Sequence, residues 1–195
     1  GVLVLGSLLT KYKKAKVSLP GGCAIGTRPV DLHLFALKKM GAKIKIKNGY
    51  IIAEAKKGLK GSTVKFPSIS VGATENALLA AFNAKGKTIL KNCAIEPEIK
   101  DLITFLIKLG AKIKFSGRTI IINESVNKKL KTNHKVMFDR IEAGTYIIAS
   151  ALVGKKITID RINPSIIKTE INLLKKIGVK IKKNKSSITI LDNKN

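Results

Sequence analysis

The sequence predicts a mixed α/β (α+β) fold built from repeated βαβαββ units, because one six-residue phrase recurs three times. The copies occupy residues 40–45, 109–114 and 177–182, and their glycines stand 69 and 68 residues apart. Each copy follows a stretch with apolar residues at helical spacing and leads into an alternating polar and apolar stretch. A unit of about 68 residues exceeds the usual solenoid repeat, so we expect the units to pack around a shared core.

The repeated glycine is expected to end a helix, since glycine favours the position just after a helix. This places helices at 29–40, 97–109 and about 165–177. After each one, an alternating strand, a turn signal such as Asn48-Gly49 and a second strand (50–52, 119–122) are typical of a β-hairpin. The remaining expected elements are short strands at 16–19, 87–90 and 156–160, helices at 73–84 and 141–153, and strands leading to those helices at 62–66 and 135–138.

The net charge of +26 suggests a polyanion partner, but the kind of basic residue argues against one. Only four of the 38 basic residues are arginine, and aromatic residues make up 5% of the chain. Proteins that bind nucleic acid favour arginine and stacking aromatics. The lysines of 43–47 alternate with isoleucine, which is typical of the solvent face of a strand. We therefore expect neither a nucleic-acid nor a membrane partner.

The first residues, 1–9, are apolar but lack the basic leader and cleavage site of a signal peptide. They read like the middle of a helix, and we expect the chain to start inside a larger protein. The two cysteines and two histidines show no metal-ligand spacing, so a reducing compartment without metal or disulfide is expected.

Cys23 lies between glycines in a loop with no acidic residue within seven positions on either side. Glycines let the backbone approach a ligand closely. Nearby cationic groups lower a thiol pKa and raise the fraction of reactive thiolate. These features favour a reacting cysteine. Cys93 stands in a similar phrase without the glycines, and we interpret it as a packing residue.

Four segments resemble the UDP-N-acetylglucosamine 1-carboxyvinyltransferases, a family of enolpyruvyl transferases: 19–32 (LPGGCAIGTRPVDL), 70–74, 96–99 and 139–145. The similarity extends in order along essentially the whole chain. Enolpyruvylshikimate-phosphate synthase shares the fold but not the cysteine loop. The resemblance implies two similar domains of three units each, joined by a hinge. Residues 1–138 would be the later part of the first, cysteine-loop domain, and residues 139–195 the first unit of the second.

The resemblance also implies roles for individual residues. In the family the loop cysteine forms an adduct with phosphoenolpyruvate and protonates its methylene carbon, which assigns Cys23 as catalytic. Arg28 matches the arginine that contacts phosphoenolpyruvate and borders the uracil ring, although it could be a surface arginine. The segment that holds the uridine matches Pro29, Val30, Asp31 and Leu32. Pro29 also suits an ordinary first helical residue, and Asp31 a first-turn acid.

Ser70, Val71 and Gly72 match the place where the family binds the nucleotide diphosphate. Free backbone N–H groups at a helix start favour a phosphate, yet a plain N-cap fits Ser70 equally well. Glu96, Asp139 and Arg140 match family acids and bases near the cleft and hinge, as do Glu98 and Glu142. Carboxylates are also favoured at helix starts for structural reasons.

The implied reaction moves the enolpyruvyl group of phosphoenolpyruvate to the 3-hydroxyl of UDP-N-acetylglucosamine and releases phosphate. This is the first committed step of peptidoglycan synthesis, in the cytoplasm, and no metal or organic cofactor is implied. The family uses further residues that these 195 residues do not contain, so we expect the rest of the polypeptide to be needed and this chain alone to be inactive. The alternative is a non-catalytic basic binding or structural module that retains the fold.

Overall fold

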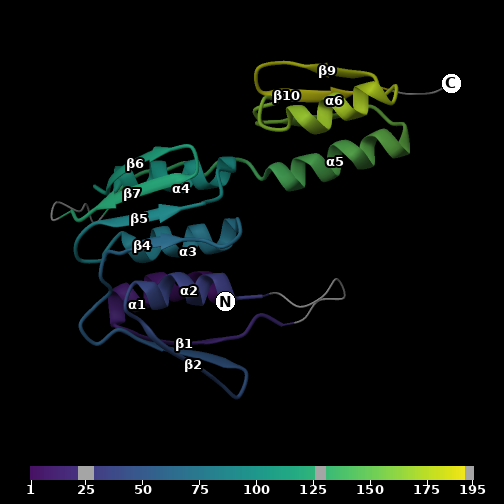
Figure 1. Ribbon diagram of the computed structural model, residues 1–195. Coiled ribbons are helices and arrows are strands. Elements are labelled where there is room, and N and C mark those ends of the chain that lie inside the picture. Colours follow the sequence, from purple (N-terminus) through teal and green to yellow (C-terminus); the bar gives the residue numbers. More distant parts are fainter. Residues whose placement is uncertain (22–28, 126–130, 192–195) are drawn as a thin grey trace. The chain divides into compact units, whose positions relative to one another are not determined.

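The computed structural model describes residues 1–21, 29–125 and 131–191 and divides the chain into two compact units. Unit 1 is Gly1–His134 and unit 2 is Lys135–Asn195 (Figure 1). The mixed α/β fold expected from the repeats is confirmed in both. The assignment of 1–138 and 139–195 to two domains of an enolpyruvyl transferase stays a prediction.

Unit 1 contains two sheets and four α-helices among its described residues. Its elements are η1 (Val2–Val4), α1 (Leu5–Tyr12), β1 (Lys14–Ser18), α2 (Asp31–Lys39), β2 (Lys43–Lys47), β3 (Tyr50–Glu54), β4 (Thr63–Lys65), α3 (Val71–Ala81), β5 (Thr88–Lys91), α4 (Pro97–Lys108), β6 (Lys112–Ser116) and β7 (Thr119–Asn123). One sheet is antiparallel with strand order β1-β3-β2. The other has the order β4-β5-β7-β6, and only its β4–β5 pair is parallel.

Helix α3 lies at the centre of unit 1, where α1, α2 and α4 pack against it (Figure 1). Seven of its 11 residues are buried, which leaves no polar face: Ala73, Thr74, Asn76, Ala77, Leu78, Ala80 and Ala81. A helix that is apolar nearly all round requires cover on every side. The alanines let neighbouring helices approach closely. One close approach is at Gly6 of α1, where an added Cβ would lie 2.5 Å from Asn76 O and 3.2 Å from Ala80 Cβ.

Unit 2 has the elements α5 (Arg140–Val153), β8 (Ile157–Asp160), α6 (Lys168–Lys176), β9 (Ile181–Lys183) and β10 (Ser187–Ile190). Its three strands form an antiparallel sheet with the order β8-β10-β9. The sheet and both helices enclose a small core of their own, centred on Ile147, Ile167, Ile188 and Ile190.

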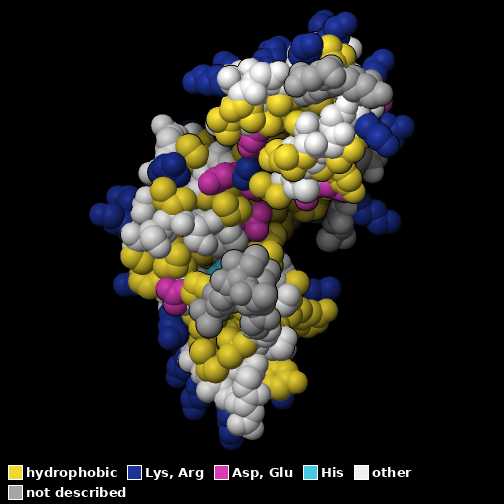
Figure 2. All heavy atoms as spheres, turned by 90° about the vertical axis from the view of Figure 1, so that its right-hand side faces the viewer, with side chains coloured by type: hydrophobic (Ala, Val, Ile, Leu, Met, Phe, Trp, Pro, Cys, Tyr) yellow, Lys and Arg dark blue, Asp and Glu magenta, His cyan; other side chains and the backbone are white. Residues whose placement is uncertain are grey.

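The repeated phrase folds as predicted in all three copies. Gly41, Gly110 and Gly178 follow α2, α4 and α6 with φ of 95°, 96° and 94°, a left-handed backbone that favours glycine. Each glycine leads into the expected hairpin, β2–β3, β6–β7 or β9–β10. The lysines of β2 are exposed, as expected, and dark blue basic side chains project from the surface in Figure 2.

Two details of the predicted repeat were wrong. Residues 135–138 form no strand, so only the middle repeat has a leading strand (β4) among the described residues. A strand needs a hydrogen-bonding partner; β4 has β5, but no described strand pairs with 135–138. Helix α6 begins at Lys168 rather than near 165, because Asn163 Oδ1 accepts bonds from the backbone N and Oγ of Ser165 and stabilises a turn there.

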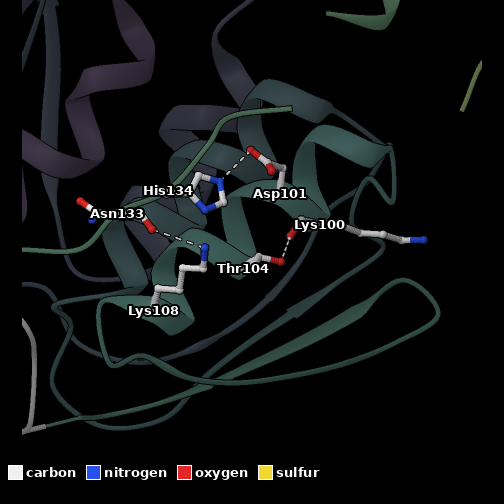
Figure 3. Close-up of polar contacts among 6 residues, drawn as sticks. All are labelled: Lys100, Asp101, Thr104, Lys108, Asn133 and His134. Carbon is white, nitrogen blue, oxygen red and sulfur yellow. Dashed lines mark hydrogen bonds and ion pairs between the residues drawn. The ribbon is translucent and has the colours of Figure 1, made fainter. Parts of the chain in front are cut away.

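The last residues of unit 1 are fixed to α4 by side-chain contacts (Figure 3). His134 Nε2 lies 3.1 Å from Asp101 Oδ2, and Lys108 Nζ donates to Asn133 O at 3.4 Å. The His134 ring also packs on Phe105, with 5.4 Å between ring centroids. These contacts hold residues 133 and 134 on α4, directly before residues 135–138, where a strand was expected. No helix among the described residues has the length and apolar character needed to span a membrane.

Candidate functional site

The predicted catalytic loop lies outside the described residues. Cys23 and Arg28 both fall within 22–28, so their roles stay predictions. Strand β1 ends at Ser18, the described chain continues to Gly21, and it resumes at Pro29, shortly before α2 begins at Asp31. The loop therefore connects the end of β1 to the start of α2, as the repeat predicts.

The start of α2 carries the four residues predicted to hold a uridine. The helix begins at Asp31, so Pro29 precedes it and is not the first helical residue, because Val30 has non-helical backbone angles (φ −112°, ψ 3°) and serves as the N-cap. Asp31 is an exposed acid in the first turn, where the helix dipole favours a negative charge. Val30 and Leu32 are half-buried and pack on the core of unit 1.

The start of α3 carries the predicted diphosphate residues. Ser70 is the N-cap, with extended backbone (φ −145°, ψ 123°), and its Oγ accepts a bond from Ala73 N at 3.2 Å. Ser70 therefore caps the helix. As in any α-helix, the first N–H groups, those of Val71 and Gly72, have no partners inside the helix. Ser70, Val71 and Gly72 are all half-buried. The geometry is that of a helix N-terminus able to accept an anion.

Two buried polar residues bring the starts of α2 and α3 together. His33 of α2 lies with its Nδ1 3.1 Å from Asn76 Nδ2 of α3. A Cβ added to Gly72 would lie 3.1 Å from His33 Cε1, so the ring also packs against the first turn of α3. Burial lowers the pKa of His33, and the nearby Asp31 carboxylate opposes that shift. The predicted uridine and diphosphate segments are thus neighbours.

Sequence reasoning missed both His33 and Asn76 as parts of this arrangement. The sequence feature that could have indicated this contact is Asn76, because it is a polar residue in an alanine-rich stretch whose other positions are expected to be buried. A buried amide needs hydrogen-bond partners, so such a residue marks a contact between elements. The identity of the partner, 43 residues away, was not accessible from spacing alone.

The β5–α4 connection repeats the β1–α2 connection and contains Cys93. Burial raises the pKa of Cys93 to about 11, and a hydrogen bond with Thr74 acts in the opposite direction. A fully buried thiol with this pKa is unreactive near neutral pH, which confirms the interpretation of Cys93 as a packing residue. Thr74 Oγ1 also accepts a bond from Ala94 N at 3.1 Å, which joins the start of α3 to this connection.

The predicted supporting acids lie at helix starts. Glu96 is the N-cap of α4, makes no side-chain cap bond to it, and instead accepts a bond from Ile95 N at 2.7 Å through Oε2. Glu98, in the first turn of α4, faces Glu75 of α3. Burial, and secondarily the charge of Glu98, raises the pKa of Glu75. The start of α4 therefore places carboxyl groups beside α3.

In unit 2, Asp139 is the N-cap of α5, and its Oδ1 accepts bonds from the backbone N atoms of Ile141 and Glu142 at 2.8 and 3.0 Å. Its carboxylate therefore has a structural role, whether or not it supports a site. Arg140 is the first residue of α5 and is half-buried. In the described parts of the chain, no three His, Cys, Asp or Glu residues form a group able to hold a metal ion.

Comparison with known sequences gives consistent matches along the chain. The profile of the EPSP synthase (3-phosphoshikimate 1-carboxyvinyltransferase) family matches residues 2–195. The UDP-N-acetylglucosamine 1-carboxyvinyltransferase of Pelagibacter ubique is 59% identical over 194 residues, covering 100% of this chain and 46% of that protein. The protein of the same name from Endomicrobium trichonymphae is 51% identical over 188 residues, covering 96% of this chain and 45% of that protein. The chain spans about half the length of the curated relatives it matches.

Solved structures show the same fold at lower sequence identity. The enolpyruvyl transferase NikO from Streptomyces tendae superimposes with a TM-score of 0.77 at 23% identity, over 97% of this chain and 46% of that one. An EPSP synthase from Acinetobacter baumannii superimposes with a TM-score of 0.69 at 20% identity, over 97% of this chain and 45% of that one. These likenesses confirm the expected fold.

Proposed function

This chain belongs to the EPSP synthase family, and we propose that it is part of an enzyme that makes enolpyruvyl-UDP-N-acetylglucosamine. The enzyme would transfer the enolpyruvyl group of phosphoenolpyruvate to the 3-hydroxyl of UDP-N-acetylglucosamine and release phosphate. The observation that carries this proposal is the identity of 59% and 51% with two proteins named for that reaction. The cysteine loop quoted from the sequence supports the same branch of the family.

The proposed transfer assigns each bond change to a group. The sugar hydroxyl oxygen bonds to C2 of phosphoenolpyruvate while the methylene carbon gains a proton from the Cys23 thiol. The bond from C2 to the phosphate oxygen then breaks, the methyl carbon gives a proton back to the Cys23 thiolate, and the carbon–carbon double bond reforms. The hydroxyl proton leaves with phosphate or solvent. Arg28 is assigned to the phosphoenolpyruvate anion, because a guanidinium pairs with carboxylate and phosphate through two parallel bonds.

The described residues support a nucleotide site at the starts of α2 and α3. We assign Pro29, Val30, Asp31 and Leu32 to the uridine and Ser70, Val71 and Gly72 to the diphosphate. The α3 start suits this role because helix N–H groups and the dipole favour phosphate. Glu96, Asp139 and Arg140 are assigned as supporting residues. We assign the enzyme to the cytoplasm and to peptidoglycan synthesis, and hence to cell-wall biogenesis, cell shape and division.

Mass spectrometry of the two cysteines tests this proposal. We expect incubation with phosphoenolpyruvate or fosfomycin, both of which react with this cysteine in the family, to add mass at Cys23. Cys93 serves as the internal control, since its buried thiol should stay unmodified while the protein is folded. Cys23→Ser should abolish the adduct. An unmodified Cys23, together with no binding of UDP-N-acetylglucosamine, would contradict the proposal.

The charge of +26 supports one second candidate, a basic module that binds polyanions without catalysis. It predicts tight nucleic-acid binding that weakens steeply with salt, because released counterions drive such binding. Salt titration in the same preparation separates the two functions. Salt-sensitive binding without a Cys23 adduct would favour the module.

The 195 residues assayed by themselves should release little or no phosphate from the two substrates. The reason is that the family places further cationic and acidic groups of the cleft outside the part that this chain matches. The measurement is phosphate release at matched concentrations of this chain and of a relative such as the Pelagibacter ubique protein. Comparable turnover would show that the chain holds a complete site.

A further inference from the structure

We propose that Asn76 is a positioning residue for the nucleotide site, holding His33 as a neutral hydrogen-bond acceptor and thereby fixing the start of α2 against the start of α3. This inference rests on the proposed function for the identity of the nucleotide. It concerns two residues that are assigned no role in binding or catalysis above. Four observations carry it: the burial of Asn76, the direction of its hydrogen bonds, the contact of His33 with Gly72, and the positions of the predicted binding residues.

Asn76 is 1% exposed and uses its amide fully. Its Oδ1 accepts a bond from Gly6 N at 2.7 Å, while its Nδ2 donates to Val2 O at 3.0 Å and lies 3.1 Å from His33 Nδ1. One side chain on α3 therefore joins three other places in unit 1: η1, α1 and α2. A buried amide that loses a partner leaves an unsatisfied polar group, so the arrangement is strongly preferred.

The backbone partners fix the orientation of the amide. The backbone N–H of Gly6 faces the amide and can only donate, so the atom opposite it must be the Asn76 oxygen. The carbonyl oxygen of Val2 faces the amide and can only accept, so the atom opposite it must be the Asn76 nitrogen. The same nitrogen faces His33 Nδ1 and can only donate to it. His33 Nδ1 therefore carries no proton, and the neutral ring has its hydrogen on Nε2.

His33 is held between two residues of α3 that lie one helical turn apart. Asn76 bonds to Nδ1, and Gly72 packs beside the Cε1–Nε2 part of the ring, where an added Cβ would lie 3.1 Å from Cε1 and 3.4 Å from Nε2. Residues at positions i and i+4 share one face of a helix, so α3 presents a slot that the imidazole fills. A side chain at position 72 would crowd the ring, so glycine there leaves room for it.

The slot sets the distance between the two predicted binding segments. His33 belongs to the first turn of α2, directly after Asp31 and Leu32, while Gly72 belongs to the first turn of α3. A nucleotide held by both segments needs them in one fixed relation, since ligand affinity depends on a preorganised site. The buried pair supplies that relation through the contact of His33 with Asn76 and Gly72.

Two substitutions at His33, made in the full-length protein, test the inference. His33→Leu fills the slot but gives Asn76 no acceptor, while the bonds of Asn76 to Gly6 and Val2 can persist. His33→Asn is the matched control, because its Oδ1 can replace Nδ1 as the acceptor. We expect His33→Leu to raise the Kd for UDP about tenfold, which corresponds to the loss of one good polar contact, and His33→Asn to stay near wild type.

Asn76→Asp gives a second test by a spectroscopic signature. The carboxylate still accepts from Gly6 N but can no longer donate to Val2 O or to His33 Nδ1, which favours a proton on Nδ1 of His33. Nitrogen NMR of the imidazole should report this change of tautomer or charge, together with weaker UDP binding. Asn172→Asp on the exposed face of α6 introduces the same charge away from the slot and should change neither.

The outcomes distinguish this inference from the proposed function. Wild-type affinity for UDP in His33→Leu and Asn76→Asp would overturn the positioning role. If the wild-type protein binds no UDP, the proposed nucleotide site is wrong, and amide exchange decides the positioning role instead. Faster exchange at the first turns of α2 and α3 in His33→Leu, but not in His33→Asn, would then support it, and unchanged exchange would overturn it.

Discussion

Helices α3 and α5 occupy the same place in successive repeats but have opposite surroundings. Both contain a threonine whose hydroxyl donates to the carbonyl four residues earlier at 2.8 Å, Thr74 to Ser70 and Thr145 to Ile141. Aligned on these threonines, Ala77 and Ala81 of α3 match Ile148 and Leu152 of α5. The two alanines are 0% and 3% exposed, whereas Ile148 and Leu152 are 46% and 82% exposed.

This difference shows that a single repeat unit does not bury all the apolar side chains of its own helices. Helices α1, α2 and α4 cover α3, and two of them belong to the preceding repeat. Within the described part of unit 2, helix α5 packs against α6, β8 and β10 of its own repeat, and its buried residues are Ala143, Gly144, Ile147 and Ser150. Its exposed apolar side chains are Ile141, Tyr146, Ile148, Leu152 and Val153. Large exposed apolar faces usually mark surfaces that another part of a protein covers.

The largest expected effect comes from adding one methyl group at each of two glycines. Gly6→Ala should lower the free energy of unfolding by about 3 kcal/mol, because the new Cβ would meet Asn76 and overpack the contact of α1 with α3. Gly144→Ala in α5 should raise it by about 0.5 to 1 kcal/mol, since no atom lies within 4 Å of the added Cβ and alanine favours a helix.

Urea unfolding, followed through the amide signals of α3 and α5 separately, measures both glycine effects. Equal destabilisation by the two substitutions would show that α5 is packed as closely as α3, contrary to the comparison.

The two threonines give a smaller, chemically matched contrast. Thr74→Val should cost about 1 to 3 kcal/mol, because the buried Ala94 N–H loses its acceptor. Thr145→Val should change stability by less than about 0.5 kcal/mol, since Thr145 is exposed and its hydroxyl bonds only within its own helix. Thermal unfolding of the two variants compares them, and a cost at Thr145 equal to that at Thr74 would contradict this account.

The buried contact of His33 should make only unit 1 sensitive to mild acid. Because burial lowers its folded pKa below 6.5, the unfolded chain binds more protons in acid, and stability is lost as the pH falls. The free energy of unfolding should fall by at most about 1.4 kcal/mol per pH unit, with the Asp31 carboxylate reducing the slope.

Urea titrations between about pH 7.5 and 5 test this slope, with His33→Asn as the variant in which it should disappear. Unit 2 should not show this slope, because both histidines of the chain lie in unit 1. At the position that aligns with Asn76 of α3, helix α5 has Ile147. A slope that persists in the variant would assign the acid sensitivity to another group.

The smallest effect is expected where unit 1 ends. Asp101→Asn should weaken the contact with His134 and speed amide exchange in residues 131–134, while the global stability changes by about 1 kcal/mol or less. Lys100→Gln, on the exposed face of the same helix, is the control. Exchange that is unchanged by Asp101→Asn would show that packing on Phe105, and not the hydrogen bond to Asp101, holds this segment.

The sequence by itself determined the elements whose signals are local. The hairpins and helix ends at Gly41, Gly110 and Gly178 follow from glycine's conformational freedom and from alternation, which act within a few residues. The N-cap at Ser70 follows from the same kind of rule. The glycine-flanked setting favours a reacting Cys23, but the roles given to Cys23 and Arg28 rest on the resemblance of their loop to a family and stay predictions, while family membership is shown for the chain.

Only the tertiary structure decided which equivalent residues are buried and which distant residues meet. Residues 135–138 have the composition of a strand, but a strand forms only where another strand supplies hydrogen bonds. The equivalent helices α3 and α5 are both apolar, and their cover depends on which neighbours are present. His33 and Asn76 are 43 residues apart, and only the packing of α2 on α3 brings their nitrogens together. Side-chain contacts across the core have no local sequence signature, because they depend on the positions of whole elements.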